Sequence, residues 1–174
     1  MDIDIIIPIY NAFDFVKKCI ETVIEHTDLT QHTLLLVNDK STDERILPLL
    51  NSFIKENQSL NIILIDNKDN QGFVRTVNIG MQYSHHDVVL LNSDTEVTRN
   101  WLSKIQNCAY SKPAVATVTP LSNNATLASV PIFLAENTIP PGLSVEEYAD
   151  IVEKCSMNLF PDIPIAHGFC MYIK

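Results

Sequence analysis

Short apolar runs alternate with helix-like segments along most of this chain, and that alternation constrains the possible folds more than any other feature. Four runs are expected to be strands: Asp4–Ile9, Thr33–Asn38, Asn61–Asp66 and Asp87–Leu91. They are rich in Val, Ile and Leu on almost every position, a pattern typical of strands buried on both faces. Strands that alternate with helices at this spacing predict an α/β fold. In that fold a mostly parallel central sheet lies between two layers of helices.

The segments between these runs carry the 3.6-residue period of amphipathic helices. Three helices are expected from this period: Phe13–His26, Phe73–Tyr83 and Trp101–Cys108. On the first of them, the period places Phe15, Cys19 and Val23 on the buried face. A fourth helix is expected to run towards Asn57 from a capping box made by Ser41 and Glu44. Pro48 lies inside that segment and should kink the helix or delay its start.

The pattern changes after Pro120, where a segment rich in Asn, Ser and Pro shows no sustained period and predicts a long loop. Ser144 and Glu147 then form a second capping box, which predicts a helix to about Asn158. A last strand is expected over Gly168–Ile173.

The composition is that of a single globular domain, expected to span residues 1–174. Hydrophobic residues make up 46% of the 174 positions, enough for a sizeable core. The net charge of -9 argues against a nucleic-acid-binding protein, which would carry a basic surface. No apolar run is long enough to cross a bilayer, and no signal peptide is evident. The four cysteines are scattered, which indicates reduced thiols in a cytosolic protein.

Polar side chains follow the buried run Asp87–Leu91 directly, in the sequence Asn92, Ser93, Asp94, Thr95 and Glu96. Right-handed crossovers bring the carboxyl ends of parallel strands to one edge of the sheet, where ligands bind. These polar groups are therefore expected at a binding edge.

Four segments at this edge, "IPIYNA", "VNDKSTDE", "DNKDNQGFVRTVNIG" and "LNSDTEV", together resemble the inverting family 2 glycosyltransferases. Two later segments, "TPLSNNATLASVP" and "GFCMYIK", resemble one bacterial branch of that family, so the resemblance covers nearly the whole chain. It implies a GT-A fold, a Rossmann-like three-layer α/β/α sandwich. Residues 1–120 would then be the nucleotide-sugar-binding part, and residues 121–174 the start of an incomplete acceptor-side part.

The resemblance implies that Asp94 holds a divalent metal ion. A glycosyl donor loses a nucleoside diphosphate, and manganese or magnesium bound by carboxylate oxygen can neutralise that leaving group. The family usually has Asp-x-Asp here, but this chain has the neutral Asn92 at the first position. Asp94 is then the main ligand, and Asn92 a contact to ribose or water, with Ser93 also in the donor site. The alternative is a strand-end turn in which Asp94 caps the next helix.

Around the base, the resemblance places Pro8, Tyr10 and Asn11 at the base and ribose. A tyrosine ring can cover a base. Asn11 could also serve as the N-cap of the following helix. Asp39 would accept a hydrogen bond from the ring N–H of a pyrimidine, and the alternative is an Asp39 that only shapes its loop.

Three further residues complete the expected donor site. Asp66 ends a strand and could assist at the base. Gly72 would let the backbone approach the ligand at a helix N-terminus, which favours anions. Arg75 would contact nucleotide or phosphate, and the alternative for Arg75 is a solvated side chain.

Inverting transfer also needs a general base. In the family this is an acidic residue beyond the strand that "GFCMYIK" resembles, and the chain ends at Lys174, so the base is expected beyond Lys174. The resemblance implies transfer from a UDP- or dTDP-sugar to a glycan, lipid-linked or protein acceptor, in polysaccharide biosynthesis. The setting would be cytoplasmic, peripheral at the inner face of the membrane through the parent protein. The alternatives are a nucleotide-sugar-binding domain without activity and, more weakly, a nucleotidyltransferase, whose Gly-rich basic loop is missing from "IPIYNAFD".

Overall fold

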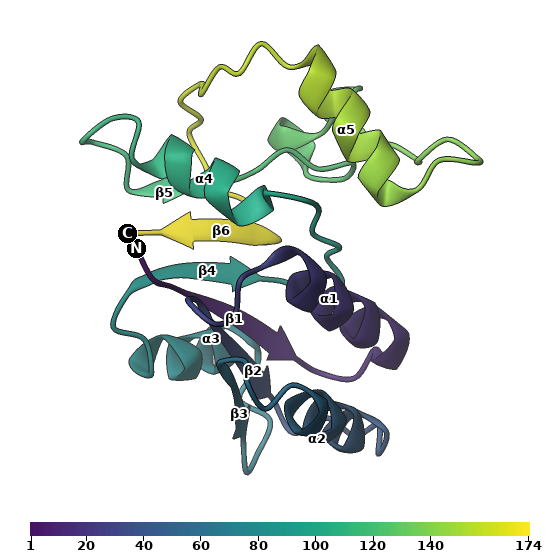
Figure 1. Cartoon of the computed structure of the whole chain (residues 1–174), viewed down its shortest axis with the longest axis vertical. Coiled ribbons are helices and arrows are strands. Elements are labelled where there is room, and N and C mark those ends of the chain that lie inside the picture. Colours follow the sequence, from purple (N-terminus) through teal and green to yellow (C-terminus); the bar gives the residue numbers. More distant parts are fainter.

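A computed structural model describes all 174 residues and shows one six-stranded sheet with the strand order β3-β2-β1-β4-β6-β5 (Figure 1). The strands are β1 (Ile3–Ile9), β2 (Thr33–Asn38), β3 (Ile62–Asp66), β4 (Asp87–Leu91), β5 (Thr117–Val118) and β6 (Cys170–Ile173). The first four are mutually parallel, whereas β6 is antiparallel to both β4 and β5. The predicted mostly parallel sheet is confirmed.

Helices cover both faces of this sheet, which confirms the three-layer arrangement. The helices are α1 (Phe13–His26), α2 (Ile46–Glu56), α3 (Phe73–Gln82), α4 (Trp101–Ala109) and α5 (Val145–Cys155), with a 3₁₀ turn at Thr126–Ala128. The larger core joins one face of the sheet to α1, α2 and α4. A smaller core joins the other face to α3 alone.

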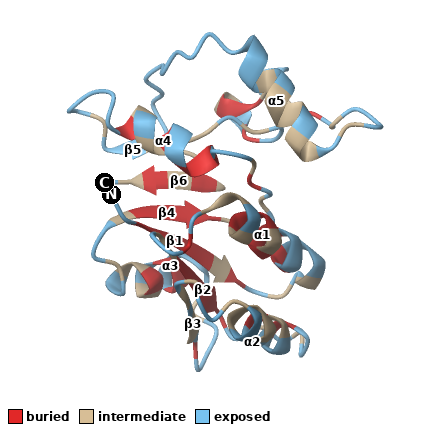
Figure 2. Ribbon diagram, viewed as in Figure 1, coloured by how far each residue is buried: buried red, intermediate tan, exposed pale blue.

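The core follows from the alternation of side chains along β1. Ile3, Ile5, Ile7 and Ile9 enter the larger core, while Ile6 enters the smaller one, and all are fully buried. Figure 2 shows that buried residues concentrate on the central strands. Because both faces of these strands are covered, the strands are apolar at almost every position.

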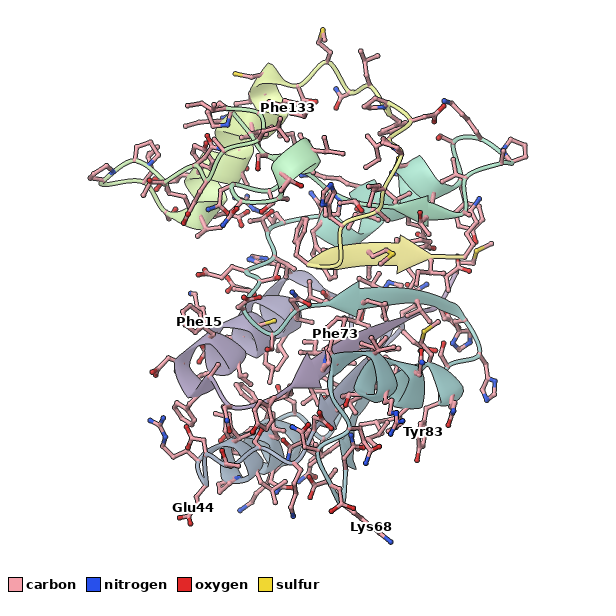
Figure 3. The ribbon with its side chains drawn as sticks, turned by 180° about the vertical axis from the view of Figure 1, so that it is seen from behind. Phe15, Glu44, Lys68, Phe73, Tyr83 and Phe133 are labelled. Atoms are coloured by element: carbon pink, nitrogen blue, oxygen red, sulfur yellow. The ribbon has the colours of Figure 1, made fainter.

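Two predictions about helices were wrong. Phe15 is 63% exposed and projects from α1 into solvent (Figure 3), and Val16 is buried in its place. The capping box of Ser41 and Glu44 does not form, because the hydroxyl of Ser41 accepts the backbone N–H of Asn11 instead. Helix α2 starts only at Ile46.

Pro48 delays the start of α2, as the sequence predicts. It occupies the first turn of that helix, where a proline removes no intrahelical hydrogen bond. At α5, by contrast, the predicted capping box of Ser144 and Glu147 is complete, although the helix ends at Cys155, three residues earlier than expected. Strand β5 was not predicted, because two residues are too few to show a period.

Helix α5 has no fully buried side chain, and ion pairs connect it to Arg99 and Lys104. The guanidinium of Arg99 lies 2.7 Å from the carboxylate of Glu146, and the ammonium of Lys104 lies 2.7 Å from Glu153. The chain on either side of α5 exposes large apolar side chains, such as Phe133 before the helix (Figure 3) and Leu159 after it. None of the helices combines the length and the apolar character that a membrane crossing requires.

Candidate functional site

The carboxyl ends of β1, β2, β3 and β4 lie at one edge of the sheet, because these four strands are parallel and adjacent. Strand β1 lies between β2 and β4, so the segment after β1 separates two groups of polar residues. One group follows β2 and β3, and the other follows β4. The predicted site residues lie near the ends of these strands, as Pro8 and Asp66 do, in the segments that follow the strands, or at the start of α3.

Asn11 ties the segment after β1 to the segment after β2. Its side-chain oxygen accepts the backbone N–H groups of Thr42 and Asp43, at 2.8 Å and 2.9 Å. The expectation that Asn11 caps α1 was therefore wrong, because the N-cap is Ala12 and no side chain caps this helix. Beside it, Tyr10 is 49% exposed, so its ring is free to cover a flat ligand.

The carboxylate of Asp39 is buried and fully engaged within the protein. It accepts the backbone N–H groups of Gln71 (2.7 Å) and Gly72 (2.8 Å) and the side-chain amide of Asn67 (2.9 Å). Burial alone would raise the pKa of Asp39, but these hydrogen bonds outweigh it and hold the pKa below its ordinary value. The sequence left two roles open for Asp39, recognition of a base and shaping of its own loop. The geometry supports the second role.

A polar hollow lies between the end of β3 and the segment that leads into α2. Its volume is about 330 Å³, and Asn38, Lys40, Ser41 and Asp66 are among the residues that line it. The side-chain amide of Asn38 donates to one carboxylate oxygen of Asp66 at 2.7 Å. The predicted role of Asp66 at the base thus coincides with an accessible surface, whereas Asp39 lies outside this hollow.

Gly72 and Arg75 lie at the start of α3. Gly72 is the N-cap residue, and its φ of +76° is a conformation that favours glycine. Its N–H points to Asp39 rather than into open space. Arg75 is exposed and makes no hydrogen bond or ion pair within the protein, so its guanidinium is free for an anionic ligand.

Asp94 lies beyond β4 at the wall of a second hollow, with a volume of about 460 Å³. Its exposed carboxylate makes no hydrogen bond or ion pair within the protein, and neither does the side-chain amide of Asn92 in the same wall. The alternative of Asp94 as a helix cap was wrong, because α4 begins at Trp101 with Asn100 as its N-cap. Ser93 follows β4 in the same turn and is half-buried.

The donor set at Asp94 fits a hard divalent cation. Magnesium-like ions bind proteins through one or two carboxylates, keep several waters and accept phosphate oxygens as further ligands. Asp94 offers two unpaired carboxylate oxygens, and Asn92 offers a neutral amide oxygen nearby in the same wall. No group of three or more His, Cys, Asp or Glu side chains in the chain could hold a metal ion alone. A cation here would therefore depend on Asp94 and on ligand oxygens.

Sequence reasoning did not assign several residues that the structure places around the second hollow. They are Ser122, Asn123 and Asn124 from the loop after β5, and Phe169, which precedes β6. The backbone N–H of Asn92 donates to the carbonyl of Phe169 at 2.8 Å, which extends the pairing of β4 with β6 into the hollow. The signal available in the sequence was the Asn pair in "PLSNNA", a concentration of amides in a segment without periodicity.

Residues 4–174 match the model of a family described as "Glycosyl transferase family 2". Over 104 residues the chain is 31% identical to polypeptide N-acetylgalactosaminyltransferase 11 of Xenopus tropicalis, which covers 58% of this chain and 17% of that protein. Over 73 residues it is 33% identical to poly(ribitol-phosphate) beta-glucosyltransferase of Bacillus spizizenii. This match covers 41% of this chain and 11% of that protein. The chain thus spans only a small part of the length of these two relatives.

Solved structures show the same fold. A mannosyltransferase from Pyrobaculum calidifontis, in complex with GDP-Man and Mn²⁺, has a TM-score of 0.61 at 17% identity, over 69% of this chain and 35% of that one. TarS 1–349 of S. aureus, in complex with UDP-GlcNAc, has a TM-score of 0.58 at 16% identity. The match covers 70% of this chain and 35% of that one. These neighbours have the GT-A fold, and the match to the family model extends over nearly every residue. The chain belongs to glycosyl transferase family 2.

Proposed function

We propose that this chain is a glycosyltransferase domain that binds a pyrimidine nucleotide-diphosphate sugar with manganese or magnesium. The protein to which it belongs would transfer the sugar, with inversion, to a glycan, lipid-linked or protein acceptor. One observation carries the proposal. Asp94 presents an unpaired carboxylate to a hollow of about 460 Å³ at the carboxyl end of β4.

Within this proposal, Asp94 would hold the cation together with oxygens of the diphosphate and water, and Asn92 would contact the ribose or a water. The chemistry that a bound divalent ion supplies is neutralisation of the charge that develops on the leaving diphosphate. Arg75, an unpaired cation on the first turn of α3, would add a second positive group. The ligands bound in two solved neighbours, GDP-Man with Mn²⁺ and UDP-GlcNAc, support a nucleotide sugar as the donor.

The base would lie at the ends of β1, β2 and β3. There the ring of Tyr10 is half exposed and Pro8 is half buried, and both could contact a flat base. Asp39 would act mainly by holding the segment after β3, while Asp66 offers a carboxylate oxygen at the accessible surface. We propose UDP or dTDP as the nucleotide. The four free cysteines support a cytoplasmic setting.

A second candidate is a nucleotide-sugar-binding domain without transfer activity of its own. The observation in its favour is that Glu96 is the only carboxylate besides Asp94 in the wall of the second hollow. Its oxygen lies 4.0 Å from the ammonium of Lys18. An inverting transferase needs a base that is free to accept the proton of the acceptor hydroxyl. Because Glu96 is paired with Lys18, this arrangement favours donor binding without transfer.

The decisive experiment is calorimetric titration of the protein with UDP, with and without Mn²⁺. We expect Mn²⁺ to strengthen UDP binding at least tenfold in the wild-type protein, and Asp94→Ala to remove that gain. Asn92→Ala should reduce it much less, because an amide carries no charge. Equal loss in both variants would show that the roles of Asp94 and Asn92 are wrongly divided. An unchanged metal dependence in Asp94→Ala would refute the proposed metal site. Transfer and donor hydrolysis, assayed separately, distinguish the two candidate functions.

A further inference from the structure

The second hollow is lined by negatively charged side chains and by no positively charged ones. Its wall contains two carboxylates, Asp94 and Glu96, and no lysine or arginine. The nearest basic partner, Lys18, pairs with Glu96 but does not line the hollow. A bound metal ion and a donor diphosphate would roughly cancel each other's charges, so the surroundings of any group beyond the diphosphate would stay negative.

Side-chain amides and the hydroxyl residues Thr95 and Ser122 form the rest of the polar lining, and two of the amides are free. The side chains of Asn92 and Asn124 make no hydrogen bond within the protein. Asn123, by contrast, donates to the carbonyl of Asn137 at 3.1 Å. A side-chain amide can both donate and accept a hydrogen bond, so it can pair with a hydroxyl group as the donor or as the acceptor.

The wall that carries Asn124 is held in place by a buried hub. The side-chain amide of Asn137 is 6% exposed, and it donates to the carbonyls of Asn123, Ile132 and Ala135 at 3.0–3.2 Å. Its oxygen accepts the N–H of Ile132 at 3.0 Å. These bonds fix the loop that lines the hollow together with Asp94, and a fixed wall can discriminate between ligands.

The hollow also has an apolar side. Phe169, half buried at the start of β6, lines it together with Ile139 and Val145. A hexose has the same mixed character, because hydroxyl groups surround apolar C–H faces. Apolar contacts combined with placed polar groups are typical of small-molecule sites.

Under the proposed function this hollow takes the donor sugar, and we propose that it selects neutral sugars. Asn124 binds a sugar hydroxyl, Phe169 contacts an apolar face, and Glu96 rejects sugars that carry a carboxylate. This inference rests on the proposed function, because it presumes a nucleotide-sugar donor.

The test compares UDP, UDP-glucose and UDP-glucuronic acid by calorimetry in the presence of Mn²⁺. The two sugars differ only at C6, where a CH₂OH group is replaced by a carboxylate. We expect the wild-type protein to bind UDP-glucose at least tenfold more tightly than UDP-glucuronic acid. Glu96→Gln should reduce that ratio to less than threefold while the affinity for UDP itself stays the same.

Two further variants complete the design. Asn124→Ala should weaken UDP-glucose at least threefold and leave UDP unchanged. Glu136→Gln, which removes one exposed charge outside the hollow, is the matched control and should keep the wild-type ratio. Equal binding of both sugars by the wild-type protein, or an unchanged ratio in Glu96→Gln, would overturn the selection. If UDP itself does not bind to the wild-type protein, the proposed function fails and this inference fails with it.

Discussion

The carboxylate of Asp39 accepts the backbone N–H of Gly72 at 2.8 Å, although 33 residues separate the two in the chain. This bond joins the end of β2 to the first turn of α3. The side chain of Asn11 makes a similar connection from the end of β1 to Thr42 and Asp43. The segments after β1, β2 and β3 are thus bonded to one another without a ligand, which reduces the ordering that ligand binding would otherwise require.

The first prediction concerns Asp39. In Asp39→Asn the new amide keeps one acceptor oxygen and presents a donor to N–H groups, so one buried N–H loses its partner. We expect the free energy of unfolding at pH 7 to fall by about 1–3 kcal/mol. Because the pKa of Asp39 is lowered in the folded protein, its carboxylate stabilises the fold above the ordinary aspartate pKa of 3.8. That stabilisation is lost as the pH falls through the lower, folded pKa.

Urea unfolding of the wild-type protein and the variant at pH 7 and below pH 3 measures both effects. The difference between the two proteins should be large at pH 7 and should shrink at the lower pH. Asp69→Asn is the control, since Asp69 is exposed and its carboxylate accepts no hydrogen bond. Identical urea midpoints for Asp39→Asn and wild type at pH 7 would contradict the prediction.

A second prediction concerns stabilisation by the proposed ligand. With Mn²⁺ and UDP at about a hundred times its dissociation constant, binding to the native state should add about 2.7 kcal/mol. For a domain of this size that corresponds to a rise in Tm of roughly 5–10 °C. Differential scanning fluorimetry of wild type and Asp94→Ala measures it, and the variant should show a smaller rise. GDP at the same concentration should have little effect, and an equal rise with GDP would argue against a pyrimidine site.

A third prediction concerns Gly80 in α3. A Cβ at this position would lie 2.6 Å from Cγ2 of Ile6 in β1, so Gly80→Ala requires the helix to move away from the sheet. We expect a loss of about 1–3 kcal/mol in unfolding free energy, the usual range for an overpacked core. Gly168→Ala is the matched control, because a Cβ there meets nothing within 4 Å. Chemical denaturation should separate the two variants clearly, and equal stabilities would show that the α3 contact is looser than the structure indicates.

A fourth prediction concerns the cysteines, which differ in burial. Cys155 is exposed, whereas Cys19 and Cys170 are buried in the larger core. Burial raises the pKa of Cys19 to about 12 and also raises that of Cys170, so neither forms the reactive thiolate near neutral pH. A thiol reagent such as iodoacetamide at pH 8 should modify Cys155 first and should reach the two buried thiols only after urea is added. Peptide mass spectrometry would reveal early labelling of Cys19 or Cys170, which this structure does not permit.

A fifth prediction concerns the attachment of α5. Since no side chain of α5 is buried, Arg99→Ala removes much of what holds the helix, namely the bonds to Glu146 and Asp150. We expect limited proteolysis to cut between residues 140 and 160 faster in the variant, with little change in Tm, because exposed ion pairs add little to global stability. Arg45→Ala is the control, since its partner Asp43 lies between β2 and α2 and makes no contact with α5 through this pair. Equal cleavage rates in wild type and Arg99→Ala would contradict this account.

Local sequence was enough to predict most of the fold. The bounds of α1, β2 and β4 agree with the predicted Phe13–His26, Thr33–Asn38 and Asp87–Leu91. Such segments can be predicted from sequence because burial on one or both faces imposes a regular spacing of apolar residues. That spacing depends only on neighbours in the chain. The same reasoning put Asn92 and Asp94 at a ligand-binding edge, since the carboxyl ends of adjacent parallel strands necessarily lie together.

Tertiary structure decided which polar groups remain available to a ligand. Asn11, Ser41 and Asp39 could all have faced a ligand or a helix end, but each is bonded to a segment about 30 residues away. The hollow beside Asp94 likewise depends on Asn124 and Phe169, which the chain brings back after a long loop. A pattern of neighbouring residues encodes the shape of a helix or strand. The partner of a polar side chain is set by distances across the fold, which no local period contains.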